Sequence, residues 1–248
     1  MLALGMDIGG SGIKSAIVDT ETGEFVSDRI RTPTPQNPSP EELLGILRDQ
    51  AAELEWHQGP AGIGFPGVIR ENVIHSAVNL GKPLLGLNLS TGLEPVLKGR
   101  VRVLNDADAA GFAEMRLGAG LPHARSGGVL LLTIGTGIGT VFFHNGMLIP
   151  NLEFGHLEIN GTSAETYVSE RARKVQNLSW KQWTRRFNAY LDHIAFLLQP
   201  DLIILGGGGV KKAEKFVPHL EIPTPWEFAR FGNRAGIIGA AAAAADAA

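Results

Sequence analysis

The sequence predicts an α/β protein with two lobes, and three observations support this fold class. A meander of short strands, followed by alternating helix and strand patterns, occurs at the start of the chain and again from about residue 128. Two glycine-rich turns each join one apolar strand to the next. Glycine accounts for 32 of the 248 residues and gathers beside strands, where it permits a close approach between the backbone and a ligand.

Composition excludes several classes of protein. The formal net charge is −3, so the overall balance gives no sign of a nucleic-acid partner. Cysteine is absent, which rules out disulfides and thiolate metal sites. Met1 leads directly into an apolar strand, and no apolar run reaches membrane-spanning length. We therefore expect a soluble cytoplasmic protein.

In the first half, apolar runs bounded by turn residues predict strands at 2–8, 13–19, 24–31, 61–65 and 101–104. Ser39-Pro40 has the pattern of a helix start, with a capping serine followed by a proline at the first helical position. This helix should run to about Trp56. A second helix is expected from about 107 to 117, closed by Gly118.

The second half repeats the plan. Strands are predicted at 128–134, 138–143, 147–149 and 202–205, and helices at 164–175, 179–198 and 235–247. We expect a small lobe formed by residues 1–107 plus 236–248 and a large lobe formed by residues 108–235. The hinge between them should lie near 106–118.

The turn in Thr133–Thr140, T-I-G-T-G-I-G-T, lies between two strands and not before a helix, which excludes a dinucleotide-binding motif of the Rossmann type. Threonine hydroxyls and successive backbone N–H groups in such a bend form a concave anion site. The candidate phosphate-binding residues are Thr133, Gly135, Thr136 and Gly137. The alternative is a tight hairpin with no ligand.

Residues 7–14, D-I-G-G-S-G-I-K, are a near copy of that turn, again between two apolar strands. Two such units suggest two related half-domains that bind one phosphate-bearing ligand. The candidate phosphate-binding residues here are Asp7, Gly9, Gly10, Ser11, Gly12 and Lys14. Asp7 suits Mg²⁺ held through water, because Mg²⁺ is commonly bound by a carboxylate and phosphate oxygens. Alternatively, Asp7 caps the turn and Lys14 is solvated.

This pair of turns resembles the two phosphate loops of the actin/hexokinase-type sugar kinases, and specifically their bacterial ROK branch. The resemblance implies a duplicated, ribonuclease H-like fold with mixed sheets flanked by helices. It also implies that Gly206, Gly207 and Gly208, which follow a buried strand, lie where this fold receives a nucleotide.

Asn105 and Asp106 follow a strand and begin a helix, so Asp106 is either a helix cap or a carboxylate aimed at a substrate hydroxyl. The block Asn105-Asp106-Ala107-Asp108 resembles the family's N-D-A-N block, with Asp in place of the final Asn. The resemblance implies that Asp106 is the catalytic base and that Asn105 holds the sugar.

Glu153-Phe154-Gly155-His156 resembles the family's E-x-G-H sugar motif, which implies that Glu153 and His156 bind sugar hydroxyls. Glu165 matches a later glutamate that closes on the anomeric side of the sugar. Asn79 resembles a further residue on the sugar side of the site.

The chain lacks the Cys/His zinc knot of most ROK proteins. The subgroup without this knot is the polyphosphate glucokinases, and stretches such as L-I-P-N-L-E-F-G-H-L-E-I resemble that subgroup closely. The resemblance implies phosphorylation of glucose at the 6-hydroxyl, polyphosphate as donor, Mg²⁺ as cofactor and a homodimer. ATP as donor, alone or with polyphosphate, and acceptance of mannose stay open.

Basic residues gather in the second half of this mildly acidic chain. They are Arg171, Arg173, Lys174, Lys181, Arg185, Arg186, Lys211, Lys212 and Lys215. Such a set is suited to a phosphate chain, or is an ordinary solvated surface. Two rival functions, a sugar-sensing repressor and a non-catalytic binding protein, are disfavoured because the first phosphate turn begins at Asp7 and because Asp106 and both turns are intact.

Overall fold

The computed structural model describes residues 1–77, 80–222 and 224–246. These form two compact units, Met1–Leu117 with Arg234–Ala248 and Gly118–Asn233. The predicted lobe boundary at 107/108 would cut α3 (Asp106–Leu117), which packs along α8 (Ala235–Asp246) and belongs whole to the first unit. The division into functional lobes stays a prediction.

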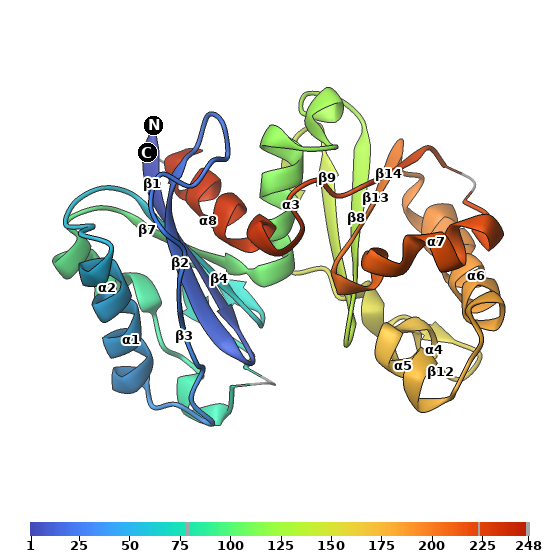
Figure 1. Cartoon of the computed structure of the whole chain (residues 1–248), viewed down its shortest axis with the longest axis horizontal. Coiled ribbons are helices and arrows are strands. Elements are labelled where there is room, and N and C mark those ends of the chain that lie inside the picture. Colours follow the sequence, from blue (N-terminus) through green and yellow to red (C-terminus); the bar gives the residue numbers. More distant parts are fainter. Residues whose placement is uncertain (78–79, 223, 247–248) are drawn as a thin grey trace. The chain divides into compact units, whose positions relative to one another are not determined.

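The first unit is built on a five-stranded sheet in the order β3-β2-β1-β4-β7. Its strands are β1 (Leu2–Gly9), β2 (Gly12–Asp19), β3 (Ile30–Thr32), β4 (Ala61–Phe65) and β7 (Val101–Asn105), with a separate ribbon of β5 (Ile69–Arg70) and β6 (Val73–Ile74). The helices α1 (Pro40–Glu53) and α2 (Leu89–Leu97) cover one face of the sheet, and α8 covers the other (Figure 1).

The alanine-rich α8 lies unusually close to this sheet because glycines face it. A Cβ on Gly5 of β1 would collide with the carbonyl oxygen of Ile237, and a Cβ on Gly62 of β4 would collide with that of Ala240. The glycines of the sheet and the alanines of the helix let the backbones approach, and α8 adds only two larger buried side chains, Ile237 and Ile238, to the core of the first unit.

The second unit repeats the sheet with the same pattern, in the order β10-β9-β8-β13-β14. Its strands are β8 (Gly128–Ile134), β9 (Ile138–His144), β10 (Met147–Ile149), β13 (Leu202–Gly206) and β14 (Trp226–Phe228), beside a ribbon of β11 (Glu158–Ile159) and β12 (Thr162–Ser163). In both sheets the first three strands of the order pair antiparallel and the remaining pairs are parallel. This confirms the predicted α/β class with two mixed sheets.

The helices of the second unit are α4 (Ala164–Val168), α5 (Glu170–Val175), α6 (Trp180–Leu198) and α7 (Ala213–Phe216). The short 3₁₀ turns of the chain are Lys82–Leu84, Leu121–His123, η3 (Phe154–His156), η4 (Gly208–Lys212), Val217–His219 and Gly232–Arg234. Trp183, Phe187 and Tyr190 of α6 pack with the apolar residues of β8 and β13 to form the core of this unit. No helix in the described ranges has the length and hydropathy needed to cross a membrane.

Three predicted elements differ from the structure. The strand at 24–31 shrinks to β3, because the Ser27 hydroxyl accepts from the Ile17 N–H where a regular strand would offer a carbonyl. The helix at 164–175 breaks at Ser169, whose extended backbone ends α4 and whose hydroxyl caps α5. The first helix ends at Glu53, three residues earlier than predicted.

Candidate active site

In the first unit, three parallel strands bring the predicted residues to one edge of the sheet. Asp7 of β1 lies opposite Gly64 of β4, and Phe65 lies opposite Asn105 of β7. Gly64 lies next to the start of α3, since a Cβ there would be in ordinary contact with the Cα of Asp106 at 3.6 Å. The carboxyl ends of parallel strands are where α/β proteins place ligands.

Asn105, and not Asp106, caps α3. The Asn105 Oδ1 atom accepts from the backbone N–H groups of Ala107 at 2.9 Å and Asp108 at 3.1 Å. The Asn105 amide also donates to the Gly67 carbonyl oxygen at 3.2 Å. Asp106, at the first helical position, accepts from the Ala107 N–H at 2.8 Å. The helix start therefore accounts for Asn105 as the cap, and it also favours an acid at Asp106, because the N-terminal end of a helix attracts negative charge.

The turn between β1 and β2 is tight and has cations beside it. Gly9 pairs with Gly12, so Gly10 and Ser11 form the exposed tip. Lys14 does not point away as a solvated side chain, because its Nζ donates to Asp7 Oδ2 at 2.9 Å. The Asp7 carboxylate also lies close to Gly236, near the start of α8, where the helix dipole favours negative charge.

Two side chains that sequence analysis missed complete this turn. Arg31 donates to the Ser11 carbonyl oxygen at 2.5 Å, and its guanidinium lies against Gly12. The Thr34 hydroxyl donates to the Gly9 carbonyl oxygen at 2.6 Å. The signal for Arg31 was its register, since β2 and β3 place it directly opposite Lys14.

In the second unit, the turn between β8 and β9 consists of Gly135, Thr136 and Gly137. Two N–H groups at this bend are already used, one from Gly135 and one from Ile138 at the start of β9, so the candidate successive donors are those of Thr136 and Gly137. Gly135 donates to the Gly137 carbonyl oxygen at 3.0 Å, and Ile138 donates to the Glu165 carboxylate at 3.3 Å. The Gly135 carbonyl oxygen accepts from Glu170 at the start of α5. The turn is thus held between a strand pair and two short helices.

The glycine loop after β13 packs on the same turn. Gly206 lies opposite Thr133 in the parallel pair of β13 and β8. Gly207 has a φ of 83°, and a Cβ there would come within 2.6 Å of the Ile134 backbone nitrogen. Only glycine fits this close, left-handed position. The predicted phosphate-binding residues of this unit, Thr133, Gly135–Gly137 and Gly206–Gly208, therefore lie together.

The segment around η3 brings the predicted sugar residues to β9. Gly155 packs directly on the Ile138 carbonyl oxygen, so a side chain there would collide. His156 Nε2 lies 3.9 Å from Glu153 Oε2, and both side chains are at least half exposed. Glu165 contacts the same stretch of backbone through Ile138. Glu153 and His156 therefore flank a glycine that packs on Ile138, and Glu165 of α4 binds the N–H of the same residue.

Comparisons with known proteins show which family this chain belongs to. A model of the ROK family matches residues 3–167. The polyphosphate glucokinase of Mycobacterium tuberculosis is 43% identical over 240 residues, which cover 96% of this chain and 89% of that protein. The chain belongs to the ROK family.

Two further ROK relatives agree in sequence and structure. The polyphosphate glucokinase of Mycobacterium leprae is 41% identical, over 96% of this chain and 73% of that protein. The crystal structure of the inorganic polyphosphate/ATP-glucomannokinase of Arthrobacter sp. strain KM superposes with a TM-score of 0.88. It is 42% identical and covers 100% of this chain and 99% of that one. The resemblance predicted from the two turns and the E-x-G-H segment is confirmed.

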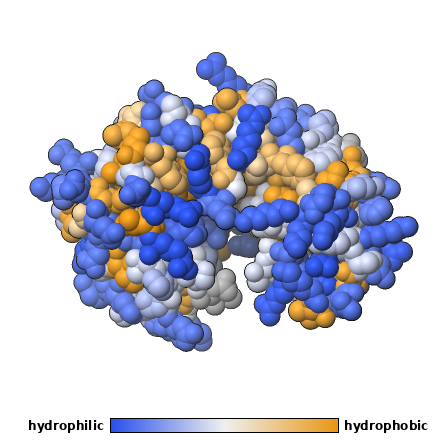
Figure 2. Space-filling view, viewed as in Figure 1, coloured by the Kyte–Doolittle hydropathy of each residue, from blue (hydrophilic) through white to orange (hydrophobic). Residues whose placement is uncertain are grey.

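The basic residues of this ROK chain divide into engaged and exposed groups. Arg173 stacks 4.2 Å above the Trp180 ring, Arg186 lies 4.7 Å above Tyr167 and donates to Gln176 at 2.6 Å, and Lys174 pairs with Glu170 at 2.9 Å. Although these three cations have partners, the surface over α5, α6 and α7 that Figure 2 shows is largely hydrophilic.

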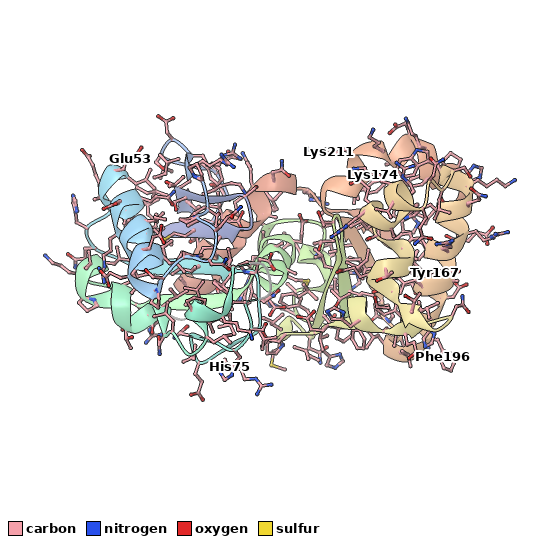
Figure 3. The ribbon with its side chains drawn as sticks, turned by 90° about the horizontal axis from the view of Figure 1, so that it is seen from below. Glu53, His75, Tyr167, Lys174, Phe196 and Lys211 are labelled. Atoms are coloured by element: carbon pink, nitrogen blue, oxygen red, sulfur yellow. The ribbon has the colours of Figure 1, made fainter. Side chains whose placement is uncertain are left out.

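The exposed group comprises Arg171, Lys181, Arg185, Lys211, Lys212 and Lys215. Lys211 and Lys174 lie at one end of the second unit and Phe196 at the other (Figure 3). Lys211 and Lys212 of η4 follow the glycine loop that packs on the β8–β9 turn. They are therefore close in sequence to the candidate phosphate-binding residues of the second unit.

Asn79, the remaining predicted sugar-binding residue, lies outside the described residues. The assignments of all these side chains to sugar, phosphate or metal stay predictions. Their clustering at the edges of the two sheets is the structural finding.

Proposed function

We propose that this chain transfers the terminal phosphoryl group of inorganic polyphosphate to the 6-hydroxyl of glucose. The observation that carries the proposal is the 43% identity with a polyphosphate glucokinase over 96% of the chain. The candidate site supports it, since each unit holds one glycine turn suited to phosphate and the second unit holds the carboxylate–histidine cluster suited to sugar.

In this mechanism Asp106 accepts the proton of the sugar hydroxyl as its oxygen attacks phosphorus. The new bond joins that oxygen to the terminal phosphorus, and the bond from this phosphorus to the bridging oxygen breaks, which leaves a polyphosphate shorter by one unit. General-base assistance of this kind contributes about 10²–10⁴-fold. Glu153, His156 and Glu165 orient the sugar, and the two glycine turns hold the phosphates.

The residues of the first unit fit a magnesium ion that arrives with the donor. No group of three His, Cys, Asp or Glu side chains within the described ranges forms a metal cage. Mg²⁺ ordinarily binds to one or two carboxylates, phosphate oxygens and water, so Asp7 with the donor phosphates is a sufficient set. When bound, the ion would neutralise charge on the phosphoryl oxygens. Asp7 would exchange part of its ion pair with Lys14 for this role.

A second candidate is a kinase that uses ATP as well as polyphosphate and accepts mannose as well as glucose. It is favoured by the 42% identity with a glucomannokinase whose name includes both donors. We also propose that the enzyme is a cytoplasmic homodimer, in line with the family expectation.

A coupled assay of glucose 6-phosphate formation tests the proposal. Purified protein is supplied with glucose, Mg²⁺ and either polyphosphate or ATP, and the product is followed through its dehydrogenase. We expect product with polyphosphate at a higher kcat/KM than with ATP. Equal or greater efficiency with ATP would favour the second candidate, and no product with either donor would overturn both.

A further inference from the structure

Thr140 is a buried polar residue to which the proposed reaction gives no role. It is the third residue of β9 after the β8–β9 turn and lies opposite Leu132 of β8. Only 3% of its surface is exposed, so its hydroxyl is enclosed by protein. A hydroxyl in such a place costs free energy unless it is hydrogen-bonded.

The Thr140 hydroxyl makes two hydrogen bonds, and they fall on either side of Glu153. It donates to the Leu152 carbonyl oxygen at 2.9 Å and accepts from the Phe154 N–H at 3.0 Å. One hydroxyl therefore holds the two peptide groups that flank the predicted sugar ligand. Its donor and acceptor capacities are both used, so the hydroxyl rotor has a defined orientation.

The peptide after Glu153 is anchored from a second direction. The Tyr190 hydroxyl of α6 lies 3.5 Å from the Phe154 carbonyl oxygen. Burial raises the pKa of the Tyr190 phenol, so the group stays protonated and able to donate. The Phe154 residue is thus held at its N–H by Thr140 and at its carbonyl by Tyr190, while Glu153 itself stays exposed.

We infer that Thr140 is a positioning residue that fixes the backbone on both sides of Glu153 and so sets the aim of the Glu153 carboxylate at the sugar. The inference rests on the proposed function, because it takes Glu153 as a sugar ligand. Thr140 is not part of the E-x-G-H motif. It connects the two predicted sites, because β9 follows the β8–β9 turn and carries the hydroxyl that binds the backbone around Glu153. A sugar-binding carboxylate on a loop needs such support to keep its orientation.

The test compares two substitutions at this position. Thr140→Val keeps the shape and removes both hydrogen bonds, whereas Thr140→Ser keeps the hydroxyl. We expect the valine variant to raise the glucose KM about tenfold, as loss of hydrogen bonds that orient one ligand group predicts. The polyphosphate KM, measured at saturating glucose, should stay within about twofold, and the serine variant should restore the glucose KM.

Thr184→Val is the matched control. Thr184 is fully buried in the same unit, and its hydroxyl donates to the Trp180 carbonyl oxygen at 2.8 Å within α6. Its valine variant should lower stability by a similar amount without changing the glucose KM. If it raised the glucose KM as much as Thr140→Val, general loosening of the unit would explain both results and the inference would be overturned. If Thr140→Val does not fold, Thr140→Ala removes the same bonds with less crowding and replaces it.

Hydrogen exchange gives a readout that does not depend on turnover. The Phe154 amide should be protected in the unmodified protein and in Thr140→Ser, and should exchange about tenfold or more faster in Thr140→Val. If the unmodified protein made no glucose 6-phosphate, the proposed function would fail. If it made the product and Thr140→Val retained either the Phe154 protection or the glucose KM, the inference about Thr140 would fail alone.

Discussion

The two glycine turns are alike in composition and differ in the charges around them. The turn of the first unit, Gly9–Gly12, receives a hydrogen bond from Arg31 and has the Lys14–Asp7 pair on its two strands. The turn of the second unit, Gly135–Gly137, has a carboxylate against it, because Ile138 donates to Glu165. Duplicated backbones thus acquire different chemistry from the side chains that neighbouring segments bring to them.

This difference suggests that the two turns have different roles. Arg31 beside the first turn suits the binding of phosphate oxygens, and Asp106 at the edge of the same sheet suits proton transfer. Glu165 contacts the second turn and belongs to α4, which packs on η3 of the sugar segment, so it would link sugar and donor. Single substitutions can change the residues of one turn without changing those of the other.

The largest effect should come from Asp106→Asn in the first unit. Turnover should fall about 10²–10⁴-fold while glucose binding is kept, because the amide accepts no proton. The matched variant in the second unit, Glu165→Gln, should act mainly on the glucose KM. Steady-state kinetics and calorimetric glucose titration measure both. If Asp106→Asn turned over at the unmodified rate, Asp106 would not be the catalytic base and would serve only the start of α3.

Cations of α6 and η4 in the second unit should give the next largest effect. Neutralising Lys211, Lys212, Arg185 and Arg186 should raise the polyphosphate KM about tenfold, most for long chains, and weaken its dependence on salt, since exposed charges are screened. Arg186 also packs on Tyr167, so the Lys211/Lys212 pair is to be measured separately. Any ATP activity should change much less.

The control for this prediction is the neutralisation of Arg70 and Lys98, two exposed cations of the first unit. It makes the same charge change as the lysine pair and should leave the polyphosphate KM unaltered. Equal losses with both donors in the four-residue variant would indicate damage to folding or a shared phosphate role. No loss with either donor would show that the cluster is a solvated surface.

Smaller changes of opposite sign in the donor KM should distinguish the charges beside the two turns. Arg31→Ala should raise the donor KM about two- to fivefold, because an exposed charge-assisted bond contributes modestly. Glu165→Gln should lower the donor KM by a similar factor at low salt, since it removes a negative charge beside the turn. Donor titrations at two salt concentrations decide this. Changes of the same sign in both variants would contradict the electrostatic contrast.

The smallest effect concerns a glycine outside both turns. Gly45 lies within α1, and a Cβ there would meet nothing within 4 Å. Gly45→Ala should therefore stabilise the protein by about 0.5–1 kcal/mol through helix propensity. Gly62→Ala, by contrast, should destabilise it, because its Cβ meets the backbone of α8. Urea unfolding compares the two, and a destabilised Gly45→Ala would contradict the packing described for α1.

Local patterns in the sequence predicted much of this architecture. The Ser39 cap is confirmed by its bond from the Glu42 N–H at 3.2 Å. An Asn-Gly pair is typical of a hairpin turn, and Asn145 and Gly146 between β9 and β10 both have positive φ. The helix α2 was missed because Gly92 and Pro95 lie inside it, which local propensity counts as helix-breaking. Its buried leucines show that packing against the sheet overrides that preference.

The site was less accessible to sequence reasoning, because side-chain placement depends on segments that are distant in the chain. The two turns were predicted from residue order, and the sugar motif was predicted from the resemblance to the ROK family. Arg31 at the first turn, Glu165 at the second and Thr140 behind Glu153 required the strand pairing and the loop packing. Such contacts leave no periodic signal in the sequence, since each depends on a single side chain.

The most direct test of the account is a phosphorus NMR spectrum of one mixture of the protein, glucose, Mg²⁺ and polyphosphate. We predict a growing glucose 6-phosphate resonance, matched by the loss of polyphosphate phosphorus and without a comparable rise in orthophosphate. The same mixture with Asp106→Asn should develop that resonance about 10²–10⁴-fold more slowly. Release of orthophosphate alone, or an unchanged spectrum from folded protein, would contradict the account.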